Sequence, residues 1–173
     1  YKPAMDSLAE YGIALERFCR YDENVYNQEP SKEAYEDAAK RKLLVAKNVN
    51  CKIKDIKSAI SDGYPVAVSF RLLEGFFKSK GGDIPMPTNE DIQSDEGKEK
   101  HSYHAMGIVG YSDALQRFVL RNSWGVEWGD NGYCYVPYAY VEDIRLCDMC
   151  CIITDIKEIN MPHLEHIPSL QID

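Results

Sequence analysis

Residues 101–133 read HSYHAMGIVGYSDALQRFVLRNSWGVEWGDNGY, and this stretch decides the fold of the second half of the chain. It holds two short runs, HAMGIVGY and RFVLRN. Met106, Ile108 and Gly110 alternate in the first run, and Phe118 and Leu120 alternate in the second. This period of two is typical of strands with one buried face. Ser112-Asp113-Ala114 separates the runs with a turn-forming composition. We therefore predict an antiparallel hairpin.

The hairpin has a histidine at one end and an asparagine near it. His104 opens the first run on the same side as Met106 and Ile108, and Asn122 closes the second run on the same side as Leu120. The start of one strand and the end of its antiparallel neighbour lie at the same end of a sheet. We therefore expect His104 and Asn122 to meet there.

A histidine and an asparagine in contact support a particular kind of chemistry. An imidazole titrates near neutral pH and can take a proton from a nucleophile if an acceptor holds its other nitrogen in one tautomer. An asparagine oxygen is such an acceptor and adds no charge, which suits a thiolate nucleophile beside an imidazolium. The pattern favours Cys–His–Asn over Ser–His–Asp. Trp124 follows Asn122 closely and could cover the hydrogen bond.

The segments HAMGIVGY and RNSWGVEWGDNGY resemble the histidine and asparagine motifs of papain-like cysteine peptidases, nearest to microbial or viral members. The similarity extends over roughly residues 6–156. It implies that His104 is the general base, that Asn122 orients it and that Trp124 shields the pair. It also implies a thiol endopeptidase that hydrolyses peptide or protein substrates without a cofactor.

The same resemblance suggests residues that border the substrate cleft. Tyr103 and Ala105 flank the histidine, and Ser69 lies in the preceding strand. Microbial members often have glycines before this histidine, whereas this chain has Ser102 and the bulkier Tyr103.

The nucleophile motif of the family is missing from the sequence. In that family a C-G-(S/A)-C-(W/Y) segment precedes the histidine and asparagine by about 130–150 residues, and counting back that far from His104 passes Tyr1. We expect an N-terminal cysteine-bearing segment or chain of the same precursor to complete the enzyme, with a propeptide or inhibitor as a further partner, and this processed chain to be inactive alone. The alternatives are an inactive papain-fold pseudoenzyme with a binding or structural role, and a structural β-barrel subunit with coincidental motifs.

Composition narrows the class of protein. The 173 residues favour one domain able to bury about 70% of its unfolded surface. A net charge of −8, from 20 basic and 28 acidic residues, argues against a nucleic-acid surface. No apolar run has the length of a membrane span. The sequence does not indicate the cellular compartment of the protein.

The expected architecture is α+β: N-terminal helices, then a mostly antiparallel sheet that curls into a small barrel. We expect residues 1–62 to form a helical segment and residues 63–173 a β-rich domain carrying the His/Asn site. The polar segment 83–100 is expected to lack structure, as a lid over the site or a solvated insertion. Helices are predicted at about 3–15, 31–44, 52–61 and 72–80, and strands at 66–72, 104–110, 118–122, 134–136 and 150–156.

The six cysteines form no dense framework, so disulfides are permitted but not required. Cys147, Cys150 and Cys151 make one C-x-x-C-C group, and a tetrahedral zinc site needs four ligands, so we predict no metal site and favour burial in an apolar strand. A disulfide, or metal or redox use, remains an alternative. Cys51 precedes a predicted helix, where the dipole would lower its pKa, but its sequence does not resemble the nucleophile motif.

Overall fold

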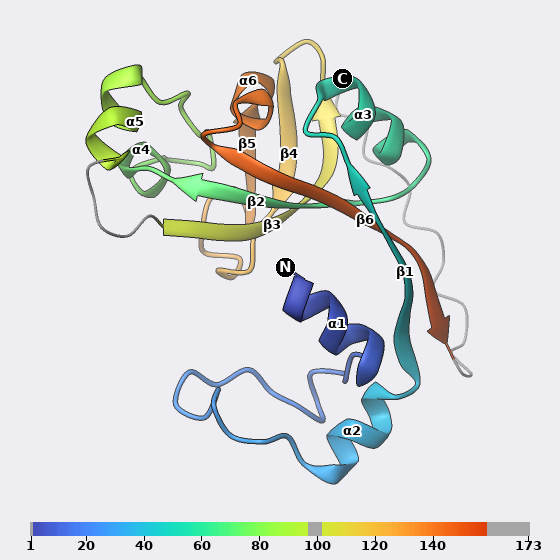
Figure 1. The fold of residues 1–173 in the computed structure, drawn as a ribbon. Helices are drawn as coiled ribbons and strands as arrows, with labels where there is room; N and C mark the ends of the chain where they lie inside the picture. The colour runs from blue at the N-terminus through green and yellow to red at the C-terminus, as the bar shows by residue number, and fades with distance from the viewer. Residues whose placement is uncertain (1, 97–101, 159–173) are drawn as a thin grey trace. The chain divides into compact units, whose positions relative to one another are not determined.

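The computed structural model describes residues 2–96 and 102–158, and Figure 1 shows their arrangement. The helices are α1 (Lys2–Glu10), α2 (Lys32–Ala38), α3 (Ile53–Ser61), α4 (Glu74–Phe77), α5 (Asn89–Glu96) and α6 (Tyr138–Glu142). The strands are β1 (Arg41–Val49), β2 (Val66–Leu72), β3 (Ser102–Ser112), β4 (Arg117–Arg121), β5 (Tyr133–Pro137) and β6 (Cys147–Glu158).

The described residues divide into two compact units. One unit holds residues 2–46 and 153–158, and the other holds residues 47–96 and 102–152. Strands β1 and β6 each contribute to both units. The predicted site residues all lie in the second unit.

The strands form one six-stranded sheet in the order β1-β6-β2-β3-β4-β5 (Figure 1). The pairings of β6 with β2, β2 with β3, β3 with β4 and β4 with β5 are antiparallel. The α+β class is therefore confirmed. The expected closure into a barrel is wrong, because β1 and β5 are the edges of an open sheet within the described residues.

Helix α3 and strand β2 follow the predicted bounds closely. In α3 the apolar positions Ile56 and Ile60 are four residues apart, and both are buried. The helix ends at Ser61 with Asp62 as its C-cap, and Gly63 follows with a φ of +88° that suits a residue without a Cβ. Strand β2 then buries nearly every side chain. A large apolar side chain contributes about 1.5–3 kcal/mol when fully buried, so these two elements carry much of the core.

The predicted hairpin is present as β3 and β4. Ile108 lies opposite Leu120, and Gly107 lies opposite Arg121. A β-bulge at Val109 shifts the register, yet the buried face still alternates as predicted. The turn covers residues 113–116, one residue more than the predicted turn-forming triplet, and Gln116 adopts a positive φ of 54°.

Two N-terminal predictions need correction, since α1 ends at Glu10 rather than near residue 15, and residues 41–44 belong to a strand. The start of α2 is as expected, because the Ser31 hydroxyl accepts from the Ala34 N–H at 3.2 Å. After α2 the Arg41 guanidinium turns back to Asp37, with Nη1 at 2.9 Å from Oδ2. The chain then enters β1, whose neighbour β6 is more than a hundred residues away, so local patterns gave no signal for it.

The segment predicted to lack structure contains helix α5. Ile92 of this helix is buried, and Asp95 is buried against Arg71 of β2 with Nε at 2.7 Å from Oδ2. The prediction was therefore wrong for residues 89–96, where an apolar contact and an ion pair hold the helix. Residues 97–100 of the predicted segment lie outside the described residues, as does His101. The short helix expected at residues 72–80 is α4, with four residues.

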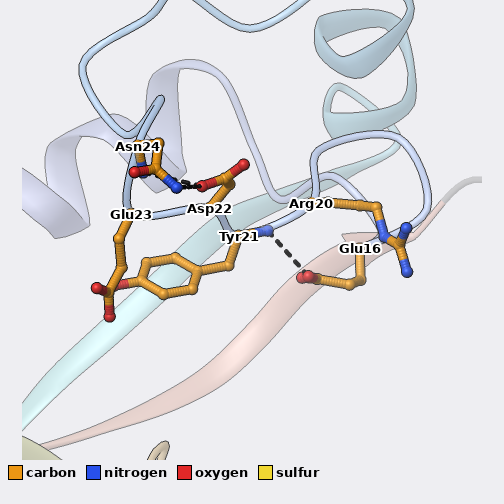
Figure 2. Close-up of a pocket in the computed structure, with 6 residues that line it drawn as sticks. All are labelled: Glu16, Arg20, Tyr21, Asp22, Glu23 and Asn24. Carbon is orange, nitrogen blue, oxygen red and sulfur yellow. Dashed lines mark hydrogen bonds between the residues drawn. The ribbon is translucent and has the colours of Figure 1, made fainter.

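The loop predicted around residues 18–30 is present within the irregular segment 11–31 of the first unit. Figure 2 shows a hollow lined by this loop, in which the Tyr21 N–H donates to Glu16 at 2.9 Å. Asn24 donates to Asp22 at 2.8 Å from its backbone and 2.9 Å from its side chain. All the lining side chains are exposed, and these hydrogen bonds join residues only two to five positions apart, so the hollow has the character of an ordinary surface loop.

Candidate active site

His104 and Asn122 meet as the hairpin predicted. Nε2 of His104 lies 2.7 Å from Oδ1 of Asn122. His104 is in β3 opposite Phe70, while Asn122 follows β4 and donates its backbone N–H to the Gly132 carbonyl at 2.9 Å. Asn122 is buried and His104 is half-buried, so the pair lies at the margin of the core.

The hydrogen bonds of Asn122 fix the tautomer of the histidine. Oδ1 of Asn122 also accepts from the backbone N–H of Ser123 at 2.8 Å. A backbone N–H can only donate, so the atom between Ser123 and His104 is the amide oxygen rather than the nitrogen. Nε2 of His104 must then carry a hydrogen, and Nδ1 of the neutral ring carries the lone pair. Nδ1 hydrogen-bonds to no side chain among residues 2–96 and 102–158 and is the nitrogen available to a reacting group.

The amide nitrogen of Asn122 differs from its oxygen in its hydrogen bonding. Nδ2 is buried and has no hydrogen-bond partner in the described part of the chain. A buried unpaired donor costs about 1–3 kcal/mol. The orientation that presents Oδ1 to His104 is therefore kept without a compensating bond at Nδ2 within the described residues.

An aromatic cluster covers the histidine. The Trp124 ring lies 4.7 Å from the His104 ring, centroid to centroid, with 31° between their planes. Trp124 also contacts Phe76 at 5.9 Å, Phe77 at 6.1 Å and Trp128 at 5.1 Å. These contacts hold the indole beside the imidazole, and the shielding of the His104–Asn122 bond by Trp124 remains a prediction. Sequence reasoning did not assign Phe76 and Phe77 to the site, although two adjacent aromatic residues in a short predicted helix were a usable signal.

The three predicted cleft residues lie on neighbouring rungs of the sheet. Ser69 of β2 pairs with Ala105 of β3, next to the pair formed by Phe70 and His104. Ser69 is buried and Ala105 is exposed. Tyr103 is 54% exposed. The structure thus gathers Ser69, Tyr103 and Ala105 around the position of His104, and their role in substrate binding remains a prediction.

None of the six cysteines hydrogen-bonds to His104 in the described part of the chain. Cys134 is fully buried, which raises its pKa to about 12. Burial is also the main reason that the pKa of Cys51 is raised to about 11. The expected lowering of that pKa by a helix start is therefore wrong, since α3 begins at Ile53 and the desolvation of the thiol dominates.

Three cysteines form a separate cluster in the second unit. The predicted burial of Cys147, Cys150 and Cys151 is confirmed, and all six cysteines are free. The Sγ atoms of Cys51, Cys147 and Cys150 lie within 4.8 Å of one another, which makes them the residues that could hold a metal ion. Sequence reasoning missed this group because Cys51 is 96 residues from Cys147.

The described helices are all too short or too polar to cross a membrane.

Known proteins resemble this chain over most of its length. It is 28% identical over 168 residues to a peptidase C1-like protein of Acanthamoeba polyphaga mimivirus, covering 91% of this chain and 52% of the relative. It is 38% identical over 90 residues to Peptidase 1 of Dermatophagoides pteronyssinus, covering 51% of this chain and 25% of the relative. The chain thus spans about half the length, or less, of these relatives.

A solved structure and a family model indicate the same kind of protein as these relatives. Xylellain, a cysteine protease from Xylella fastidiosa, superimposes with a TM-score of 0.75 at 25% identity, covering 92% of this chain and 61% of that one. The model of the papain family of cysteine proteases matches residues 2–154. That match includes the hairpin and both members of the hydrogen-bonded pair. The chain belongs to the papain family of cysteine proteases.

Proposed function

We propose that this chain supplies the histidine and asparagine of a thiol endopeptidase whose nucleophilic cysteine lies on a segment outside this sequence. The observation that carries the proposal is the 2.7 Å bond from His104 Nε2 to an Asn122 oxygen whose identity Ser123 fixes. Because this bond places a hydrogen on Nε2 of His104, Nδ1 is the atom that accepts a proton. Family membership supports the same chemistry.

The reaction follows from the protonation states of the pair. The nucleophile transfers its proton to Nδ1 of His104, and the thiolate attacks the peptide carbonyl carbon. The imidazolium gives this proton to the leaving amine as the C–N bond breaks, which leaves a thioester. His104 then accepts a proton from water as the hydroxide attacks the thioester, and returns it to the departing thiolate. Asn122 stays neutral and holds the ring in one orientation throughout.

The surroundings of the pair support the same role. Trp124 lies against the imidazole and excludes water from the bond to Asn122. Ser69 and Ala105, which pair across β2 and β3, and the exposed Tyr103 would border the substrate.

The partner of this chain is a cysteine-bearing segment of the same precursor, whether still attached or cleaved. None of the six cysteines of this chain hydrogen-bonds to His104 in the described part of the chain, which supports a nucleophile supplied by another segment. Residues 1–62 would complete the helical side of the enzyme, and residues 63–173 would carry the His/Asn site. A propeptide or inhibitor is a further partner of the cleft.

The test is a thiol-reactive probe on the full-length protein that carries this sequence. An epoxide or vinyl-sulfone peptide probe is added, and the label is mapped by mass spectrometry in every polypeptide of the preparation. We expect one labelled cysteine outside residues 1–173. His104→Ala should abolish the labelling. Asn122→Ala should slow it by about 10- to 150-fold, because a hydrogen bond to a charged group contributes about 1.5–3 kcal/mol.

Asn50→Ala is the matched control. Asn50 is exposed and its side-chain amide donates to the nearby Asp55 at 2.8 Å, so truncating it should leave the labelling rate unchanged. Labelling of one of the six cysteines of this chain, or of none in any polypeptide, contradicts the proposal.

The alternative is a papain-fold protein that binds partners without catalysis. Tyr103, the 54% exposed residue that precedes His104 in β3, favours it, because a side chain of this bulk at the border of the cleft would hinder substrate access. The residue of the full-length precursor that aligns with the nucleophile distinguishes the two functions directly. A residue other than cysteine there would establish the pseudoenzyme.

A further inference from the structure

Three thiols from distant parts of the second unit converge in one place. Sγ of Cys147 lies 3.8 Å from that of Cys51 and 3.8 Å from that of Cys150, and Cys150 lies 2.9 Å from Cys51. Cys147 and Cys150 are 1% and 2% exposed, while Cys51 is half-buried in the bend before α3. The family mechanism uses none of these residues, so their convergence requires a separate explanation.

An irregularity in β6 brings two of these thiols to one face. In a regular strand, residues three positions apart point to opposite faces. The pairing of β6 with β2 shifts register here, because Phe70 lies opposite Cys147 whereas Val68 lies opposite Cys150. The extra residue in β6 turns Cys147 and Cys150 toward the same side. Bulges of this kind re-aim side chains and are common next to functional sites.

The spacing of the thiols fits a thiophilic metal ion. Zinc–sulfur bonds of about 2.3 Å in a tetrahedral site place the sulfurs about 3.8 Å apart. Both distances from Cys147 already have this value. Only the 2.9 Å between Cys51 and Cys150 must open, and Cys51 can move because it lies in a bend rather than in a strand or helix.

A disulfide explains less of the geometry. Closing Cys51 and Cys150 to a bond of about 2.05 Å would use two thiols and leave Cys147 buried beside them without a role. Three thiolates around one ion use the whole cluster. A divalent ion also offsets two of their three negative charges, whereas a monovalent ion offsets one.

We propose that Cys51, Cys147 and Cys150 bind one Zn²⁺ ion, with a solvent molecule on the half-exposed side of Cys51 as the fourth ligand. The site would link the residue before α3 to β6 across 96 residues of sequence. Zinc would therefore act as a clamp between the helix and the central strands, independently of the catalytic pair. Structural zinc of this kind stabilises a fold because the unfolded chain has no preformed site.

The test uses the full-length protein, reduced and freed of metal with a chelator. Zn²⁺ is added, and the bound metal is counted by elemental analysis after gel filtration. Co²⁺ replaces it for absorption spectroscopy, in which thiolate ligands give a near-ultraviolet charge-transfer band. We expect one ion per chain, the charge-transfer band, and a higher thermal unfolding midpoint with Zn²⁺. Cys51→Ser, Cys147→Ser and Cys150→Ser should each weaken binding on the order of 100-fold or more.

Two cysteines provide matched controls. Cys151→Ser changes the neighbour of Cys150 in the same strand, and Cys19→Ser changes an exposed cysteine, so neither should affect metal binding. Because a buried Ser at position 147 or 150 can unfold the protein, the half-exposed Cys51→Ser variant is decisive if its circular dichroism matches the wild type. The proposal is overturned if the reduced protein binds no Zn²⁺, if Cys51→Ser binds it as tightly, or if the cysteines of the freshly isolated protein form a Cys51–Cys150 disulfide and take up no metal after reduction.

Discussion

The ion pair between Arg71 and Asp95 anchors helix α5 to the strand that neighbours the site, and breaking it should destabilise the protein strongly. Nε of Arg71 lies 2.7 Å from Oδ2 of Asp95, and the two side chains are 5% and 6% exposed. Replacing Arg71 with Met removes the guanidinium that lies against this buried carboxylate. Removing one partner of a buried pair costs about 3–5 kcal/mol, since the remaining charge stays desolvated.

The size of the effect follows from the chain length. For 150–250 residues, 1 kcal/mol lowers the unfolding midpoint by about 2–4 °C, so Arg71→Met and Asp95→Asn should each lower it by roughly 6–20 °C. The double variant Arg71→Met/Asp95→Leu removes both charges and should recover most of the loss. Lys78→Met is the matched control, because Lys78 and Glu74 form an exposed pair whose loss costs about 0.5 kcal/mol or less.

The assays are thermal and urea denaturation, both followed by circular dichroism, and hydrogen exchange over residues 89–96. If α5 detaches to hydrate the charge, the global free energy of unfolding falls less, but exchange over the helix accelerates. The reasoning is refuted if Arg71→Met lies within about 1 kcal/mol of the wild type and exchange in α5 is also unchanged.

Three further predictions concern the stability of the protein at low pH, the reactivity of two cysteines and the replacement of one glycine. Hydrogen bonds from Arg41 hold the pKa of Asp37 well below its usual range, so the stability they provide should be complete above about pH 4 and decline as the pH falls further. In urea denaturation at a series of pH values, Asp37→Asn should therefore make the free energy of unfolding depend less on pH below about 4. At pH 8 iodoacetamide should alkylate the exposed Cys19 but leave the buried Cys134, with its pKa of about 12, until the protein unfolds, as peptide mapping would show. Gly129 and Gly125 both have a positive φ, but only at Gly129 would a Cβ collide with the Tyr133 carbonyl. In urea denaturation, Gly129→Ala should therefore lower the free energy of unfolding by roughly 1–3 kcal/mol more than Gly125→Ala does. Equal losses in the two variants would contradict this.

Local sequence patterns were sufficient for elements whose signals lie within a few residues. The four-residue spacing of Ile56 and Ile60 predicted α3, and alternation around Ile108 and Leu120 predicted the hairpin. The Ser31 cap marked the start of α2. In each case the residues that form the element also carry its hydrogen bonds or its buried stripe, so the pattern is visible along the chain.

The same kind of signal predicted the contact between His104 and Asn122. Both residues end runs of period two, and antiparallel pairing brings the ends of such runs together. The sequence did not show that Ser123 fixes the orientation of the amide, nor that Phe76 and Phe77 support the indole of Trp124. These contacts depend on the positions of side chains in the folded hairpin and in α4.

Other features depended on partners far away in the chain, and only the tertiary structure decided them. The 41–49 segment became a strand because β6 lies beside it, and α5 formed where Asp95 could pair with Arg71. The cysteine cluster needed both the approach of Cys51 across 96 residues and an extra residue in β6 that reversed the usual alternation. The sequence by itself determined the hairpin, its His–Asn pair and the family; the folded sheet decided which distant side chains share a site, because register and bulges set those contacts rather than spacing along the chain.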